Sequence, residues 1–283
     1  MCFSFFETAG IRLVCILTQT IFICTPLLLG WMSQDSANVY ETSTETLFLG
    51  RQDAMQRISL EPIIAQSKQL EADSVTQQAQ GQQQSSSEKK PMRVLEIACG
   101  TGRFMTFVRD NLPLDTEYAA IDLSPFYLEK ARDNDAYWRK TRLSQETEEQ
   151  GTTNGKTNAV TTIPPAKLIQ ANAESLPFEN ESFDAVLCVY LFHELPREAR
   201  AQVASEMARV SKAGGTVVLT DSMQKGDRPP LDGALQNFEK MNEPYYVDYT
   251  LDDLPSHFEK AGLTPMEKAV RSSTKMLSFR KEE

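Results

Sequence analysis

The chain has 283 residues, of which 41% are hydrophobic, and its formal net charge is −10. This length is sufficient for one substantial buried core and allows one or two domains. The negative charge and the pI near 4.9 argue against nucleic acid as a substrate, because affinity for phosphates depends largely on clustered Lys and Arg side chains.

The N-terminal segment, residues 1–34, is hydrophobic. Residues 11–32 are mostly apolar and form a stretch about long enough to cross a bilayer as a helix. Three interpretations stay open: a membrane anchor, a cleaved signal or organelle-targeting presequence, and a start site that is not the native one. The first two predict a membrane-associated or organellar protein, with association through residues 11–32.

Three further regions follow in chain order. Residues 35–70 have intermittent helical periodicity and predict a helical extension. Residues 71–91 are rich in Gln and Ser and too polar to pack, which predicts a disordered linker. Residues 92–283 predict one α/β domain, in which the polar residues 144–162 are expected to form a solvated loop insertion.

The domain opens with a predicted strand at 93–98, a small-residue loop and a predicted helix at 102–112. Gly100 and Gly102 provide the backbone freedom that a tight turn beside a ligand requires. A dinucleotide dehydrogenase would usually have a third glycine at position 105, where this chain has Met105. Glu96 at the end of the strand can accept hydrogen bonds from the amine or hydroxyls of a cofactor, and its charge suits a cationic one.

A second predicted strand, 117–122, ends in Asp122, twenty positions after Gly102. An acidic residue at this place can bind both hydroxyls of a ribose. Ser124 and Pro125 then predict the start of a helix at 125–140, with serine as the cap and proline in the first turn.

The segment Leu95–Gly102 resembles the first motif of class I S-adenosylmethionine-dependent methyltransferases, especially the ubiquinone and menaquinone methyltransferase group (methyltransferase type 11). Asp122 and the segments 171–178 and 182–190 continue this resemblance, which covers roughly residues 92–222. Asn172 stands where family members often have Asp, so its amide oxygen would replace a carboxylate beside the adenine. The resemblance implies S-adenosyl-L-methionine as cofactor, bound by Glu96, Ala98, Cys99, Gly100, Thr101, Gly102, Asp122, Leu123, Asn172, Ala173, Glu174 and Val189. It also implies that a helix before the first strand covers the cofactor, and Tyr40 could belong to that helix. The alternative for this region is a surface helix or a tether.

The remaining pattern alternates strands and helices, which predicts a parallel sheet covered on both faces. We expect strands at 167–171, 183–190, 216–220, 264–270 and 274–280, and helices at 198–212, near 232–242 and near 251–261. Together with the family resemblance, this predicts a Rossmann-like, seven-stranded, mostly parallel sheet. Its ligand crevice should lie at the carboxyl ends of the first strands, where the strand order reverses.

His193 follows the predicted strand 183–190 directly and is the candidate general base for an acceptor hydroxyl. A structural role for this histidine, hydrogen-bonding the loop, stays open. Tyr190, Phe192, Tyr245, Tyr246 and Tyr249 are candidates for the acceptor pocket, because aromatic surface suits a flat or lipid-like molecule. The alternative for the three last tyrosines, which we place in a non-helical segment, is packing of the final helix on the sheet.

No metal site is predicted. His193 and Glu194 begin like a metalloprotease helix, but position 197 is Arg197 rather than the second histidine. The five cysteines show no paired metal-ligand spacing, which predicts free thiols in a reducing compartment.

The resemblance implies an enzyme that transfers a methyl group from S-adenosylmethionine to a small-molecule acceptor by in-line displacement. The acceptor could be a quinone, a lipid, a phenolic or another metabolite. The alternative is a catalytically silent S-adenosylmethionine-binding protein with an assembly or regulatory role. Tyr245-Tyr246 and the segment 275–279 also resemble methyltransferases of plant plastids and cyanobacteria, which indicates a plastid address. Neither the acceptor nor the oligomeric state follows from the sequence.

Overall fold

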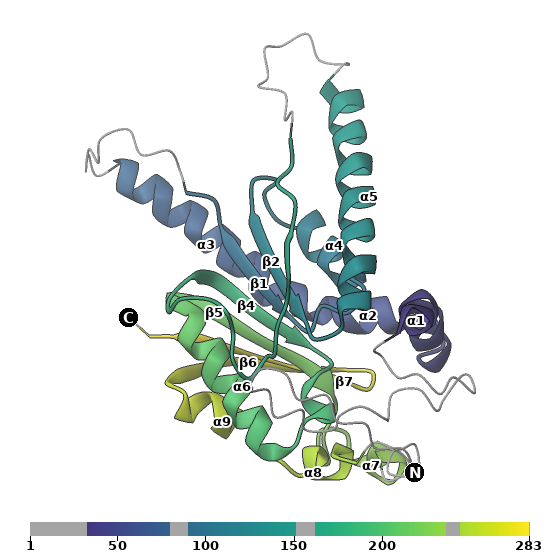
Figure 1. The fold of residues 1–283 in the computed structure, drawn as a ribbon. Coiled ribbons are helices and arrows are strands. Elements are labelled where there is room, and N and C mark those ends of the chain that lie inside the picture. The colour runs from purple at the N-terminus through teal and green to yellow at the C-terminus, as the bar shows by residue number, and fades with distance from the viewer. Residues whose placement is uncertain (1–32, 80–89, 151–161, 236–243, 283) are drawn as a thin grey trace.

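The computed structural model describes residues 33–79, 90–150, 162–235 and 244–282 (Figure 1). The predicted hydrophobic segment at 11–32 therefore lies outside the described residues. No helix within the described ranges is both long enough and apolar enough to cross a membrane.

Seven strands form one sheet in the order β3-β2-β1-β4-β5-β7-β6. β7 runs antiparallel to both of its neighbours, and the other pairings are parallel. The predicted seven-stranded, mostly parallel sheet is confirmed. The strands are β1 (Arg93–Ile97), β2 (Glu117–Asp122), β3 (Lys167–Gln170), β4 (Phe183–Val189), β5 (Ser211–Ser222), β6 (Leu263–Arg271) and β7 (Thr274–Lys281).

Helices cover both faces of the sheet because its central strands are apolar on both sides. Every residue of β4 is buried, as expected for a central parallel strand. On one face, α6 (Arg197–Val210) and α9 (Leu254–Lys260) enclose a core that includes Leu95, Val186 and Phe279. The opposite face packs against α4 (Arg103–Asp110), the start of α5 (Pro125–Gln150) and Ile63 of α3 (Leu60–Ala79).

The N-terminal extension packs on the domain through its later part. It consists of α1 (Gln34–Leu47), α2 (Gln52–Gln56), the 3-10 turn η1 (Arg57–Ser59) and α3. Ser59 donates a 2.7 Å hydrogen bond to the hydroxyl of Thr220 in β5, and Thr216 donates a 2.8 Å bond to the amide oxygen of Gln66. These contacts hold the extension along β5, from the level of the start of β1 to the level of its end.

Two predicted polar segments begin as helix. α3 continues to Ala79, so the first nine residues of the predicted linker 71–91 are helical. α5 continues to Gln150, so residues 144–150 of the predicted loop insertion belong to that helix. The physical reason is shared: Glu, Gln and Ala propagate a helix that has already begun, even where no apolar face requires it. Residues 80–89 and 151–161 lie outside the described part.

Other element ends also differ from the prediction. α6 ends at Val210 rather than 212, and β5 begins at once with Ser211, so Gly214 and Gly215 lie within the strand instead of ending the helix. The predicted helix near 232–242 is described only as α7 (Asp232–Leu235), which follows the 3-10 turn η3 (Pro229–Leu231). The segment with three tyrosines, predicted as non-helical, forms the short helix α8 (Tyr246–Thr250). A five-residue helix carries too little periodicity for the sequence to show it.

Candidate functional site

The loop after β1 has the conformation that a ligand-binding turn requires. Ala98, Gly100 and Gly102 all have positive φ, at 56°, 54° and 76°. For Ala98 this conformation is strained, and such strain is concentrated at functional sites. Gly102 has a packing reason as well, because a Cβ there would lie 2.9 Å from the Cβ of Ala131 in α5.

Asp122, at the end of β2, holds this loop. One carboxylate oxygen accepts a 2.8 Å hydrogen bond from the N–H of Gly100, and the other accepts a 2.8 Å bond from the N–H of Ser124. Burial raises the pKa of Asp122 to about 6, although these backbone hydrogen bonds oppose the shift. The predicted pairing of the glycine loop with the acidic end of β2 is therefore present in the structure.

Glu96 lies on the neighbouring strand and is almost fully buried, with 2% of its surface exposed. It accepts a 2.8 Å hydrogen bond from the hydroxyl of Tyr118. Burial raises the pKa of Glu96 to about 8, and the nearby charge of Asp122 contributes in the same direction. The two carboxyl groups thus belong to one electrostatic site, as the sequence predicts.

Helix α1 packs over the loop that follows β1. Glu41 accepts a 2.8 Å hydrogen bond from the hydroxyl of Thr101 and a 3.1 Å bond from the amide of Asn134. Tyr40, one residue earlier, places a ring carbon 3.7 Å from the point where a Cβ of Gly100 would lie. A helix before the first strand that covers the loop, with Tyr40 in it, agrees with the expectation from the family resemblance.

The side chains beneath α1 are acidic and aromatic. The rings of Tyr40 and Tyr127 lie 5.0 Å apart. Burial raises the pKa of both phenols, and the charges of Asp122 and Glu194 raise them further. Side chains from the ends of β1, β2 and β4 therefore meet under one helix, and their charges favour a cationic ligand.

The structure places the other predicted cofactor residues either in turns beside the strand ends or in the hydrophobic cores. The amide oxygen of Asn172, expected to meet an adenine amine, accepts a 2.9 Å hydrogen bond from the N–H of Glu174 and so shapes its own turn. Leu123 and Glu174 are partly buried beside the ends of β2 and β3, where their carbonyls accept side-chain hydrogen bonds. Three residues instead pack in the hydrophobic cores: Ala173, Cys99 and Val189.

His193 lies just beyond β4 and is paired with a residue that the sequence analysis missed. Its Nδ1 is 2.6 Å from Oδ1 of Asp221, near the end of β5. The other carboxylate oxygen accepts hydrogen bonds from the N–H groups of Phe192, at 2.8 Å, and His193, at 3.3 Å. Asp221 is 1% exposed, so a buried carboxylate fixes both the backbone and the ring of the histidine. The signal available in the sequence was an acidic residue at the end of the apolar strand 216–220.

The second nitrogen of His193 lies near another carboxylate. Its Nε2 lies 3.9 Å from a carboxylate oxygen of Glu194, whose charge also acts on Tyr40 and Asp122. A carboxylate at Nδ1 stabilises the tautomer that carries the proton there, which leaves Nε2 of the neutral ring as a proton acceptor.

Three of the five predicted acceptor residues surround His193. The rings of Tyr190, Tyr246 and Tyr249 lie 6.3, 6.0 and 6.2 Å from the imidazole, each close to edge-on. Tyr190 has a positive φ of 55° and stacks on Phe48 from the end of α1. Helix α1 therefore contacts the cofactor loop, and Phe48 at its end contacts a ring that lies beside the histidine.

The prediction for Phe192 is wrong, and that for Tyr245 gains no contact. Phe192 is fully buried and stacks on Phe258 of α9 at 5.7 Å, so it belongs to the core. Tyr190 and Phe192 are aromatic residues two positions apart, so the sequence pattern does not distinguish them. In the structure, the 3-10 turn η2 (Phe192–Glu194) directs the ring of Phe192 into the core. Tyr245 precedes α8 and is not among the rings that contact His193 in the described residues.

The groups around this loop fit S-adenosylmethionine by their chemistry. A positive-φ glycine allows close approach of a ligand, and Asp122 stands where ribose hydroxyls would be bound. Asp122 and Glu194 supply negative charge to offset a cationic ligand, whereas the raised pKa of Glu96 keeps that carboxyl largely protonated near neutral pH. Among the described residues, no group of three or more His, Cys, Asp or Glu side chains is arranged to hold a metal ion. The two described cysteines, Cys99 and Cys188, are buried free thiols.

Comparison with known proteins agrees with this geometry. A family model described as a methyltransferase domain matches residues 95–219. The chain is 33% identical over 182 residues to a phosphatidylethanolamine N-methyltransferase of Cereibacter sphaeroides. The matched region covers 62% of this chain and 73% of that protein. It is 27% identical over 136 residues to a demethylmenaquinone methyltransferase of Staphylococcus aureus, covering 48% of this chain and 45% of that protein. An O-methyltransferase family protein from Burkholderia thailandensis has a similar fold, with a TM-score of 0.51 at 17% identity, covering 89% of this chain and 64% of that one.

Proposed function

Because this chain belongs to the class I S-adenosylmethionine-dependent methyltransferases, we propose that it methylates a small lipid-like acceptor whose proton is taken by His193. The observation that carries the proposal is the 2.6 Å contact between Nδ1 of His193 and the buried carboxylate of Asp221. This contact orients the imidazole and stabilises the positive charge that it gains when Nε2 accepts a proton.

Binding and catalysis are assigned to different residues. The loop around Gly100, with Asp122, Glu96 and Tyr40, would hold the cofactor under α1. When bound there, S-adenosylmethionine supplies a methyl group on a sulfonium, which is already a good electrophile. The protein then has to align the acceptor and exclude water, and α1 is suited to both because it contacts the loop and Tyr190.

His193 acts on the acceptor. A hydroxyl or ammonium acceptor would lose a proton as its electron pair forms the new bond to the methyl carbon, while the carbon–sulfur bond of the donor breaks and its electron pair leaves with the sulfur as a neutral thioether. Nε2 of His193 would receive the proton, and the carboxylate of Asp221 at Nδ1 would orient the ring. A group that accepts a proton in this way typically contributes about 10²–10⁴-fold to the rate.

The acceptor class is proposed from the aromatic surroundings and from two relatives. Of the three rings around His193, Tyr190 is partly exposed, whereas Tyr246 and Tyr249 are buried and the hydroxyl of Tyr249 donates to the carbonyl of Ser222. An aromatic ring beside the proposed base suits an amphipathic molecule with a reactive head group. One relative is named for an ethanolamine phospholipid and another for a quinone precursor. We therefore expect a lipid-class acceptor, with a phospholipid amine and a quinone-type hydroxyl as the two candidates to compare.

The test measures transfer of a tritiated methyl group from S-adenosylmethionine into phosphatidylethanolamine vesicles, a hydroxynaphthoquinol and a simple phenol. His193→Gln should lower kcat at least about 100-fold and leave the affinity for S-adenosylmethionine unchanged. His257→Gln is the matched control, because His257 also contacts a buried carboxylate, Asp252, at 2.9 Å but lies in α9. This control should keep nearly full activity.

The result that would overturn the proposal is equal activity of the two histidine variants, which would leave His193 a structural role. Binding of S-adenosylmethionine without label transfer to any acceptor would instead support the silent binding protein. Asp221→Asn gives an independent check, because the amide still fills the site but cannot stabilise a protonated imidazole. Its kcat should fall, while its affinity for S-adenosylmethionine should stay unchanged.

A further inference from the structure

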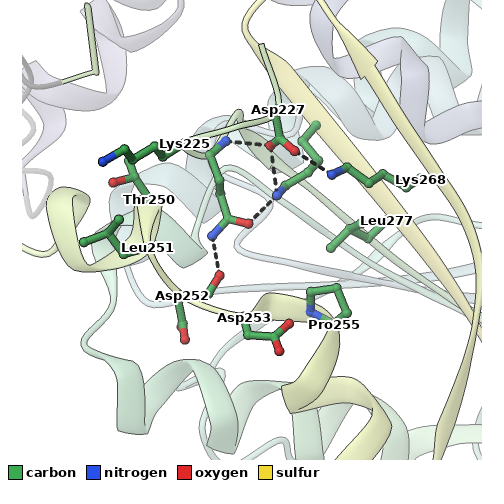
Figure 2. A pocket seen from close by; sticks show the side chains of 11 residues that line it. Lys225, Asp227, Thr250, Leu251, Asp252, Asp253, Pro255, Lys268 and Leu277 are labelled. Carbon is green, nitrogen blue, oxygen red and sulfur yellow. Dashed lines mark hydrogen bonds and ion pairs between the residues drawn. The ribbon is translucent and has the colours of Figure 1, made fainter. Parts of the chain in front are cut away.

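We call His193 and the tyrosines around it the acceptor end of the site. A polar cavity of about 370 Å³ lies beside this end. Figure 2 shows the side chains that line the cavity. It is bounded by the segment that follows β5, by the end of α8 and start of α9, and by β6 and β7. Its lining contains three lysines: Lys225, Lys268 and Lys275. None of these three lysines belongs to the predicted cofactor site around the loop after β1.

Lys275 is the central cation of this cavity. Its side chain is 5% exposed, and its ammonium group pairs with Asp227 at 2.9 Å and donates to the amide oxygen of Gln224. An ammonium group has three N–H donors, and the third has no acceptor among the described residues. Burial lowers the pKa of Lys275, so an additional anion would be a favourable neighbour.

One carboxylate serves two lysines here. Asp227 pairs with Lys268 at 2.6 Å as well as with Lys275, and it also accepts a 2.7 Å hydrogen bond from the N–H of Gln224 (Figure 2). Its own pKa is lowered by these cations, which offset the effect of its burial. The group of two ammoniums and one carboxylate therefore keeps a surplus positive charge.

The other acidic residues of the lining change this balance little. The carboxylate of Asp252 is paired from outside the cavity with Arg200 and with Arg197, at 3.3 Å. Asp253 contributes one negative charge, and Lys225 contributes one positive charge. The cavity is thus net positive, in contrast to the acidic group of side chains under α1.

We propose that this cavity binds a phosphate ester through Lys275 and Lys268. Two lysine ammoniums match a doubly charged oxyanion, which accepts several hydrogen bonds at once. The volume exceeds what a bare phosphate fills and leaves room for the organic part of an ester, while the lining is polar enough to exclude an apolar occupant. The ester could be a soluble metabolite or a lipid head group, since both present the same chemistry.

The cavity adjoins the residues that surround His193. Lys275 in β7 is the cross-strand partner of Asp221 in β5. Gln224 donates hydrogen bonds to the carbonyls of Tyr249 and Asp252, so it forms the wall between the cavity and the ring that contacts His193. A phosphate here would lie next to the acceptor end of the site and away from the cofactor loop.

The test is a binding measurement that needs no methyl transfer, so its outcome is independent of the proposed activity. Calorimetry compares inorganic phosphate, glycerol 3-phosphate, and vesicles of phosphatidylcholine with and without phosphatidic acid. Lys275→Met and Lys268→Met should each weaken binding about tenfold or more, because each removes a charged hydrogen-bond donor. Lys140→Met is the matched control, since Lys140 is exposed on α5, and it should bind like the unaltered protein.

Asp227→Asn provides a change in the opposite direction. Removing the internal carboxylate frees both ammoniums, so phosphate should bind several-fold more tightly, which a misfolded variant could not do. Glycerol 3-phosphate binding in solution would identify a soluble ester, whereas binding only to phosphatidic acid vesicles, lost in Lys275→Met, would identify a head group. Failure of all probes to bind, or equal binding by Lys275→Met and Lys140→Met, would overturn the proposal.

Discussion

The two ends of the site are built in different ways. At the cofactor end, Asp122 contacts the backbone of Gly100 and of Ser124, two residues along the chain. At the acceptor end, His193 depends on Asp221, which is 28 residues away on another strand, and on rings from α8. The first end is fixed mainly by turns next to two strands, and the second by the packing of separate elements. Changes at the first end should therefore alter cofactor affinity, and changes at the second should alter turnover.

The largest effect at the cofactor end is expected from Asp122→Asn. A carboxylate accepts from both Gly100 and Ser124, whereas an amide has one oxygen and would place its NH₂ group against one of the two N–H donors. The affinity for S-adenosylmethionine should fall about 10- to 100-fold, because hydrogen bonds to a charged group are lost. Calorimetric titration measures this change.

The control for that experiment is Asp115→Asn, in the exposed turn before β2. It should leave cofactor affinity unchanged. Since the pKa of Asp122 is about 6, the affinity of the unaltered protein should also decrease as the pH falls below that value, because protonation removes the charge. Equal affinities of the two variants would show that the cofactor does not bind at this loop.

Glu96 gives the second prediction, which concerns stability. Its pKa is raised from 4.5 to about 8 in the folded protein, so the folded state binds more protons than the unfolded state between these values. The free energy of unfolding should therefore decrease as the pH rises through this range, by an amount of the order of a few kcal/mol. Glu96→Gln, which keeps the acceptor for Tyr118, should remove most of this dependence.

Thermal unfolding at pH 5 and pH 8 measures the effect. The variant should gain stability relative to the unaltered protein at pH 8 and differ little at pH 5. Glu129→Gln, an exposed residue of α5, is the control and should follow the unaltered protein at both values. A parallel pH dependence in Glu96→Gln would mean that another group titrates.

The contrast between the two ends also explains what the sequence could predict. The strands at the start of the domain, the glycine loop and Asp122 follow from local patterns, because an apolar strand, a turn and a cap are adjacent in the chain. The role of Asp221 does not, since it depends on the parallel pairing of β4 with β5 and on the turn that carries His193. Phe192 shows the same limit: only the direction of one 3-10 turn decides whether its ring lines a pocket or joins the core.

The extent of the helices was the other error, and its cause is local. The sequence 71–79 lacks an apolar stripe, so it reads as linker, yet it contains no proline or glycine to end α3. Charged and amide residues continue α5 to Gln150 in the same way. Polarity identified these segments as solvated, but it did not determine their backbone conformation.

The smallest effect is expected at Arg103, whose ion pairs hold α1 and α2 against α4 and form a charged clamp on α1. Arg103, in the first turn of α4, makes a bidentate pair with Asp53 at 2.8 and 2.7 Å and lies 3.5 Å from Glu41 and Glu45 of α1. These carboxylates raise the pKa of Arg103, so it remains charged. Arg103→Gln should release α1 partly and weaken cofactor affinity by about 1 kcal/mol, because the pair is partly exposed and screened.

Salt provides the discriminating measurement for this last variant. The affinity of the unaltered protein should fall with ionic strength more steeply than that of Arg103→Gln, since only the former has the charged clamp to screen. Arg132→Gln, exposed on α5, is the control and should keep the full salt dependence. If all three proteins respond alike, α1 is held by its Tyr40 and Thr101 contacts alone, and the two ends of the site are joined by packing rather than by charge.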